Sequence, residues 1–197
     1  MISEAGLSGG FEVPVLGAQA AFRALLAALS EPGTIVPLTD MAEPPAPLGA
    51  AAGTILATLA DHDAAVFLDE RLRVKDVADW IAFHTGAPLT ADAALASFAV
   101  LSAPGTVPLA AFAEGSHDYP DRSTTVIVQV PALGGETAVR LTGPGIKTAR
   151  EIALPVASGW LAEWRANHAR FPLGVDVVFV AGETLLGLPR TTRIGGI

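Results

Sequence analysis

The stretch over residues 171–193 constrains the fold of this chain more than any other. It contains two apolar runs, 175–181 and 184–188, separated only by a Gly-Glu pair. A glycine and one further residue between two β-prone runs are typical of a two-residue type II′ turn, so we expect an antiparallel hairpin. Pro189 ends the second strand because proline has no N–H to donate to a ladder.

Upstream of this hairpin, patterns typical of helices and of strands alternate. Apolar residues at helical spacing predict a helix from Pro14 and helices near 48–60, 75–83, 107–113 and 158–168, the last with Ser158 as its N-cap. Short apolar runs predict strands near 34–36, 65–68, 97–101, 125–130, 138–142 and 152–154.

The early alternation favours parallel strands with helical crossovers, and the later runs favour antiparallel strands added to the same sheet. Strands 125–130 and 138–142 are expected to form a hairpin of that sheet. The fold class expected is therefore α/β, a three-layer α/β/α arrangement around a mixed sheet. We expect one domain over 14–197, preceded by an arm over 1–13 with little structure of its own.

Composition excludes several classes of function. The chain has no cysteine, so disulfides, thiolate nucleophiles and iron–sulfur or cysteine zinc sites are excluded. Its net charge of -8 argues against nucleic acid as a partner, because the protein's field repels a polyanion. No apolar run is long enough to cross a membrane, and the first residues lack the pattern of a signal peptide. We therefore expect a soluble, cytoplasmic protein.

Residues 190–193 are a candidate anion site. Arg190 and Arg193 flank Thr191 and Thr192, and two guanidiniums with two hydroxyls are good donors for a phosphate or phosphonate. The alternative is a solvated tail that pairs with acidic neighbours.

A glycine-rich turn after the strand at 138–142 is a second candidate. Gly143 and Gly145 could direct backbone N–H groups at a phosphate, and Lys147 follows. Pro144 removes one of these donors, and a purely structural turn explains the same residues.

Two histidines are candidate acid/base groups. His84 lies near a predicted helix end, where it could also simply interact with the helix dipole. His62 stands between Asp61 and Asp63, in what could equally be a solvated turn. The four histidines are isolated from one another in the sequence, so no metal site is predicted.

The chain as a whole resembles the phosphonate metabolism protein PhnH family of bacterial carbon–phosphorus lyase. The motifs that carry the resemblance extend over nearly the whole length, and their order and spacing are more specific than any one of them. They include Phe83-His84-Thr85-x-Ala87-Pro88-Leu89, Arg140-Leu-Thr-Gly-x-Gly-Ile146, Phe171-Pro-Leu-Gly-x-Asp176 and Leu188-Pro-Arg-Thr-Thr192. The chain departs from the family pattern at Asp121, where glutamate is expected.

The resemblance implies a subunit of the carbon–phosphorus lyase core complex, working with subunits G, I and J. With G, I and an ATP-binding-cassette-like subunit L, the family is associated with displacement of adenine from ATP by an alkylphosphonate. The resemblance also implies a fold like the large domain of pyridoxal-phosphate-dependent transferases without the cofactor. When isolated, the subunit is expected to form a homodimer through apolar surface. It supplies no catalytic residues. The rival hypotheses are a stand-alone nucleotide- or phosphate-binding enzyme that uses Arg190 and Arg193, and a scaffolding homodimer.

Overall fold

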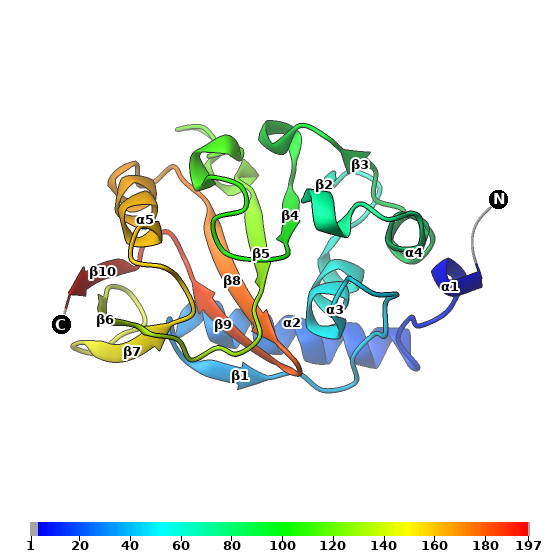
Figure 1. Cartoon of the computed structure of the whole chain (residues 1–197), viewed down its shortest axis with the longest axis horizontal. Coiled ribbons are helices and arrows are strands. Elements are labelled where there is room, and N and C mark those ends of the chain that lie inside the picture. Colours follow the sequence, from blue (N-terminus) through cyan, green and yellow to red (C-terminus); the bar gives the residue numbers. More distant parts are fainter. Residues whose placement is uncertain (1–3, 197) are drawn as a thin grey trace.

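The structure, a computed structural model, describes residues 4–196 (Figure 1). Its helices are α1 (Glu4–Leu7), α2 (Pro14–Ser30), α3 (Ala50–Leu59), α4 (Lys75–Thr85) and α5 (Trp160–Ala169), and its short 3₁₀ turns are η1 (Glu70–Leu72), η2 (Ala93–Leu95), η3 (Leu109–Ala111) and η4 (Pro120–Arg122). Its strands are β1 (Ile35–Pro37), β2 (Val66–Leu68), β3 (Leu89–Thr90), β4 (Phe98–Leu101), β5 (Thr125–Gln129), β6 (Thr137–Thr142), β7 (Arg150–Leu154), β8 (Asp176–Ala181), β9 (Thr184–Leu188) and β10 (Arg193–Gly196).

Seven strands form a mixed sheet in the order β1-β9-β8-β5-β4-β2-β3. Within this sheet β8, β5, β4, β2 and β3 pair in parallel. Strand β9 pairs antiparallel with both β8 and β1. The mixed α/β class expected from the sequence is confirmed. So is the hairpin of β8 and β9, whose two-residue turn has Gly182 at a φ of 52°.

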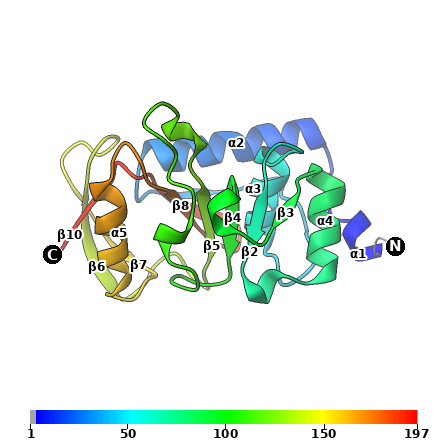
Figure 2. The same ribbon diagram turned by 90° about the horizontal axis from the view of Figure 1, so that it is seen from above.

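Both faces of this sheet are buried, which explains why its central strands are continuously apolar. Along β8, Val178 and Val180 face a core formed with α2, α3 and α4, whereas Val177 and Phe179 face a second core. The second core also contains residues of η3, α5, β6, β7 and β10. Figure 2 shows α2 and α3 on one side of the sheet and α5 on the other.

A second sheet covers part of the face that α5 occupies, and it was not expected. Its order is β10-β6-β7, and all its pairs are antiparallel. The expected hairpin of β5 with β6 is wrong, because β4 and β8 already pair with both edges of β5. Burial explains the difference: β5 is buried along its centre, whereas β6 alternates between buried and more exposed residues, as an outer sheet requires.

Three local expectations also need correction. The N-cap of α5 is Gly159 rather than Ser158, and no side chain caps this helix. The helix expected over 107–113 is only the 3₁₀ turn η3. The N-terminal segment, expected to have little structure, contains α1, which contacts α4, and the Gly9 carbonyl accepts a hydrogen bond from the Glu43 N–H at 2.8 Å.

Candidate functional site

Arg190, the centre of the predicted anion site, points into the protein. Its Nε donates to Asp176 Oδ1 at 3.2 Å, and its Nη2 lies 2.5 Å from Asp176 Oδ2. Nη1 donates to the Pro120 carbonyl at 2.8 Å, and Nη2 also donates to the Ser123 hydroxyl. All three guanidinium nitrogens therefore have protein acceptors, and the side chain joins the end of β9 to the start of β8 and to the loop before β5.

The other residues of this stretch have different environments. Thr192 is fully buried, its carbonyl accepts from Trp164 Nε1 at 2.9 Å, and its own hydroxyl has no partner among the described residues. Arg193 is exposed and begins β10, and its Nε donates to His168 Nε2 at 3.4 Å. Since His168 Nδ1 lies 2.8 Å from the Arg190 carbonyl, these two contacts fit the neutral tautomer with the proton on Nδ1.

The glycine turn lies beside this stretch, because Thr142 at the end of β6 pairs with Arg193. Gly143 has a φ of 137°, and a Cβ atom there would lie 2.9 Å from the Thr191 carbonyl oxygen. A Cβ atom on Gly145 would lie 1.9 Å from the carbonyl oxygen of Ser30, at the end of α2. Close packing against two backbone segments therefore accounts for both glycines.

The two candidate histidines lie in unrelated places. His84, in the last turn of α4, has its Nε2 3.2 Å from the Ser8 carbonyl oxygen and its ring centroid 4.9 Å from that of Trp80. His62 lies in the exposed turn after α3, with its Nε2 3.4 Å from Asp63 Oδ2. The structure thus brings the glycine turn beside residues 191–193, but it brings neither histidine to them. Over residues 4–196 no group of three or more potential ligands from His, Cys, Asp and Glu could hold a metal ion.

The sequence analysis missed a hollow of about 390 Å³ at the carboxyl edge of the parallel strands. It lies where β2 and β4 end, and Asp69, Arg71, Arg73 and Ser102 are among its lining residues. After β2 the chain passes to α4 on one face of the sheet, and after β4 it passes to η3 on the other. Ligands of open α/β sheets bind at such a switch point. A polar residue after each buried strand, Asp69 and Ser102, was the signal in the sequence.

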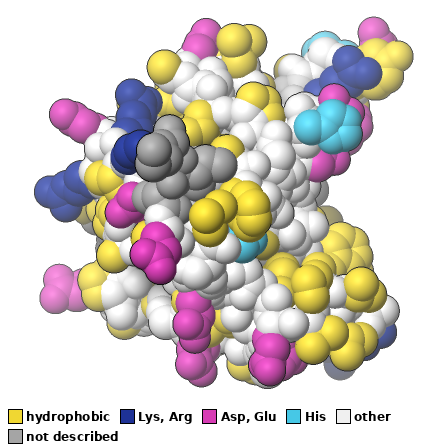
Figure 3. All heavy atoms as spheres, turned by 90° about the vertical axis from the view of Figure 1, so that its right-hand side faces the viewer, with side chains coloured by type: hydrophobic (Ala, Val, Ile, Leu, Met, Phe, Trp, Pro, Cys, Tyr) yellow, Lys and Arg dark blue, Asp and Glu magenta, His cyan; other side chains and the backbone are white. Residues whose placement is uncertain are grey.

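The exposed side of α2 carries several large apolar residues beside Gln19 and Arg23. Val15, Phe22 and Leu26 are 79%, 50% and 57% exposed. Their spacing of seven and four residues places them on one side of the helix, and we call this set the α2 stripe. Figure 3 faces the end of the molecule where α2 begins and shows hydrophobic side chains gathered at its lower right. No helix of the described part of the chain is long and apolar enough to cross a membrane.

Comparison with known proteins identifies the family of this chain. A family model described as "Bacterial phosphonate metabolism protein (PhnH)" matches residues 9–195. A protein of Rhizobium meliloti (strain 1021) named "Alpha-D-ribose 1-methylphosphonate 5-triphosphate synthase subunit PhnH" is 45% identical over 95% of this chain and 94% of its own length. A "Putative C-P lyase subunit protein HtxG" of Stutzerimonas stutzeri is 33% identical over 89% of this chain and 85% of its own length. The chain therefore belongs to the PhnH family of bacterial phosphonate metabolism proteins.

Proposed function

We propose that this protein is a subunit of a carbon–phosphorus lyase system. In this role it assists the transfer of the ribose triphosphate part of ATP to an alkylphosphonate, with release of adenine. The observation that carries the proposal is the 45% identity, over nearly the full length of both chains, to a subunit named for the synthesis of ribose 1-methylphosphonate 5-triphosphate. A subunit of such a system acts in the cytoplasm, where ATP is available.

In the proposed complex the protein contacts subunits G, I and J, and the isolated protein forms a homodimer. The α2 stripe supports an interface of this kind, since several large apolar side chains exposed on one helix are a typical feature of surfaces that another protein covers. We assign the homodimer contact to this stripe.

The contacts of Arg190 favour an assisting subunit over a stand-alone enzyme built on Arg190 and Arg193. A guanidinium that already binds Asp176, Ser123 and two backbone carbonyls has few donors left for a substrate. The proposed role needs no resident cofactor. Lys75 lines a hollow beside α4 but is exposed and pairs with Asp79, and Lys147 is exposed, so neither resembles the buried lysine of a pyridoxal phosphate enzyme. A sheet with helices on both faces supports the proposed likeness to the large domain of those transferases.

Genetic complementation tests this function. A bacterium whose carbon–phosphorus lyase system lacks only its own PhnH protein is supplied with this chain and grown on methylphosphonate as the sole phosphorus source. We expect that the chain restores growth and that the empty vector does not. Failure to grow while the protein is present at normal levels and folded would contradict the proposal. Growth on inorganic phosphate is the control for general fitness.

A further inference from the structure

The hollow between the ends of β2 and β4 is lined by two cationic side chains, Arg71 and Arg73. Arg71 is exposed, and no hydrogen bond or ion pair joins its side chain to any residue from 4 to 196. Arg73 is held in place, because its Nε donates to the Leu68 carbonyl at 2.7 Å and its guanidinium lies 4.9 Å from the centre of the Phe67 ring. No described residue accepts from the terminal nitrogens of Arg73, so one unpaired and one preorganised guanidinium line the same hollow.

Asp69, the buried acidic residue of the hollow, does not pair with Arg71 or Arg73. Asp69 is 4% exposed, and its carboxylate accepts from the Ser102 N–H, the Ser102 hydroxyl and the Leu72 N–H. These three donors satisfy its oxygens and fix the loop after β4 against η1. Glu70 also lines the hollow, and it is the one lining carboxylate without such partners in the described chain.

The loop after β4 adds backbone donors. Among the described residues, the N–H groups of Gly105, Thr106 and Val107 have no protein acceptor, and Thr106 and Val107 line the hollow. Gly105 has a φ of 77°, and no heavy atom lies within 4 Å of where its Cβ would be, so this part of the loop is open. Free N–H groups beside two guanidiniums favour a small tetrahedral oxyanion as ligand.

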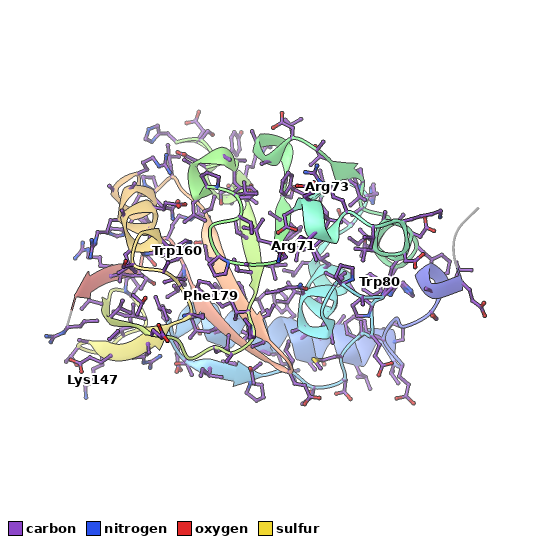
Figure 4. All side chains as sticks on the ribbon, viewed as in Figure 1. Arg71, Arg73, Trp80, Lys147, Trp160 and Phe179 are labelled. Atoms are coloured by element: carbon purple, nitrogen blue, oxygen red, sulfur yellow. The ribbon has the colours of Figure 1, made fainter. Side chains whose placement is uncertain are left out.

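We propose that the hollow at the β2–β4 switch point binds a phosphonate or phosphate group, with Arg71 and Arg73 as its principal ligands. The preference for an oxyanion rests on the two guanidiniums, and the choice of phosphonate or polyphosphate rests on the proposed function. Figure 4 shows Arg71 and Arg73 on the same part of the ribbon and Lys147 away from both. Lys147, exposed in the turn before β7, is therefore a suitable control cation.

Isothermal titration calorimetry of the full chain with methylphosphonate, and separately with inorganic triphosphate, tests the site. We expect saturable binding of at least one probe, and the tighter probe identifies the phosphonate or the polyphosphate as the source of the group. Since hydrogen bonds to charged groups are strong, Arg71→Ala and Arg73→Ala should each weaken binding by about tenfold or more. Glu70→Gln removes a nearby negative charge and should tighten binding about twofold to fivefold. Lys147→Ala should leave binding unchanged.

Two results would overturn the proposal: no saturable binding of either probe, or equal binding by wild type and both arginine variants. If Arg73→Ala does not fold, Arg71→Ala decides alone, because that side chain is exposed and has no partner within the described chain. The complementation assay separates this inference from the proposed function. If the chain restores growth but binds neither probe, only the proposed anion site is rejected. If the chain binds a probe but does not restore growth, the proposed function is rejected.

Discussion

Asp176 and Arg190 form a two-point ion pair between the first residue of β8 and the second residue after β9. Two guanidinium nitrogens contact the carboxylate, and the Arg190 backbone N–H also donates to Asp176 Oδ1 at 2.7 Å. The pair is mostly buried, with 12% of the Arg190 side chain and 22% of the Asp176 side chain exposed. It closes the hairpin at the end opposite to its turn, so its role in this structure is to stabilise the fold.

Removing Arg190 should therefore destabilise the protein. Arg190→Ala removes the guanidinium from the Asp176 carboxylate and the Ser123 hydroxyl and leaves Asp176 only the backbone N–H of residue 190, so we expect the free energy of unfolding to fall by about 2–4 kcal/mol. Urea denaturation followed by circular dichroism measures the loss. Arg122→Ala is the control, because Arg122 stacks on Tyr119 at the surface, and its loss should cost about 1 kcal/mol or less. Equal midpoints for Arg190→Ala and wild type would show that the pair contributes nothing.

The buried hydroxyl of Thr192 predicts a stabilising substitution. This group has no hydrogen-bond partner within residues 4–196, so Thr192→Val removes a desolvated polar atom and should raise the free energy of unfolding by about 1 kcal/mol. Thr54 is a matched control, since it is equally buried and its hydroxyl accepts from the Ala42 N–H at 2.9 Å. Thr54→Val should destabilise by about 1–2 kcal/mol in the same urea titration. Opposite signs are the expected result, and a destabilised Thr192→Val would contradict it.

Gly187 in β9 lets helix α2 approach the sheet. A Cβ atom there would lie 2.7 Å from the Ala28 carbonyl oxygen and 2.8 Å from its carbon. Gly187→Ala should push α2 away from the strand and lower the free energy of unfolding by about 1–3 kcal/mol, as overpacking does. Gly195→Ala, in β10, is the control because its nearest atom would be an ordinary contact at 3.7 Å. The melting temperatures of both variants, measured by thermal unfolding, test this prediction. Equal melting temperatures for Gly187→Ala and Gly195→Ala would contradict the close approach of α2 to β9.

The α2 stripe predicts how the isolated protein assembles. Leu26→Glu places a charge in the α2 stripe, the proposed homodimer contact, and should weaken dimerisation by about thirtyfold or more, which sedimentation velocity detects as a shift to monomer. Leu95→Glu makes the same change on an exposed leucine (68%) of η2 and should leave the dimer intact. A dimer that survives Leu26→Glu would place the contact elsewhere.

Much of the main sheet could be predicted from the sequence. The runs of β2, β4 and β8 are short, apolar and buried along their centres, and the Gly-Glu pair after Ala181 permits only a tight turn. The second sheet could not be predicted in this way. A period of two in β6 shows that one face is covered, but it does not identify the strand that pairs with it, and β10 comes from residues 193–196 far along the chain.

The candidate site was harder to predict than the fold. Arg190 is a residue type that often binds anions, and the sequence does not show that it is already paired. Its acceptors at Pro120, Ser123 and Asp176 are far from it in sequence, and Asp176 lies within an apolar strand. Arg71 and Arg73 give no signal in the sequence, because two arginines in a polar turn are ordinary. Only the topology, which places the ends of β2 and β4 side by side, shows that they line one hollow.

The most direct test of the proposed function is a pull-down with the other subunits. Affinity-tagged full-length chain is expressed together with subunits G, I and J of a carbon–phosphorus lyase system, and the purified material is analysed by mass spectrometry and native gel. We predict that the three subunits are retained with the chain in a fixed ratio through size-exclusion chromatography. If the chain is folded and elutes alone while G, I and J assemble without it, the central claim is contradicted.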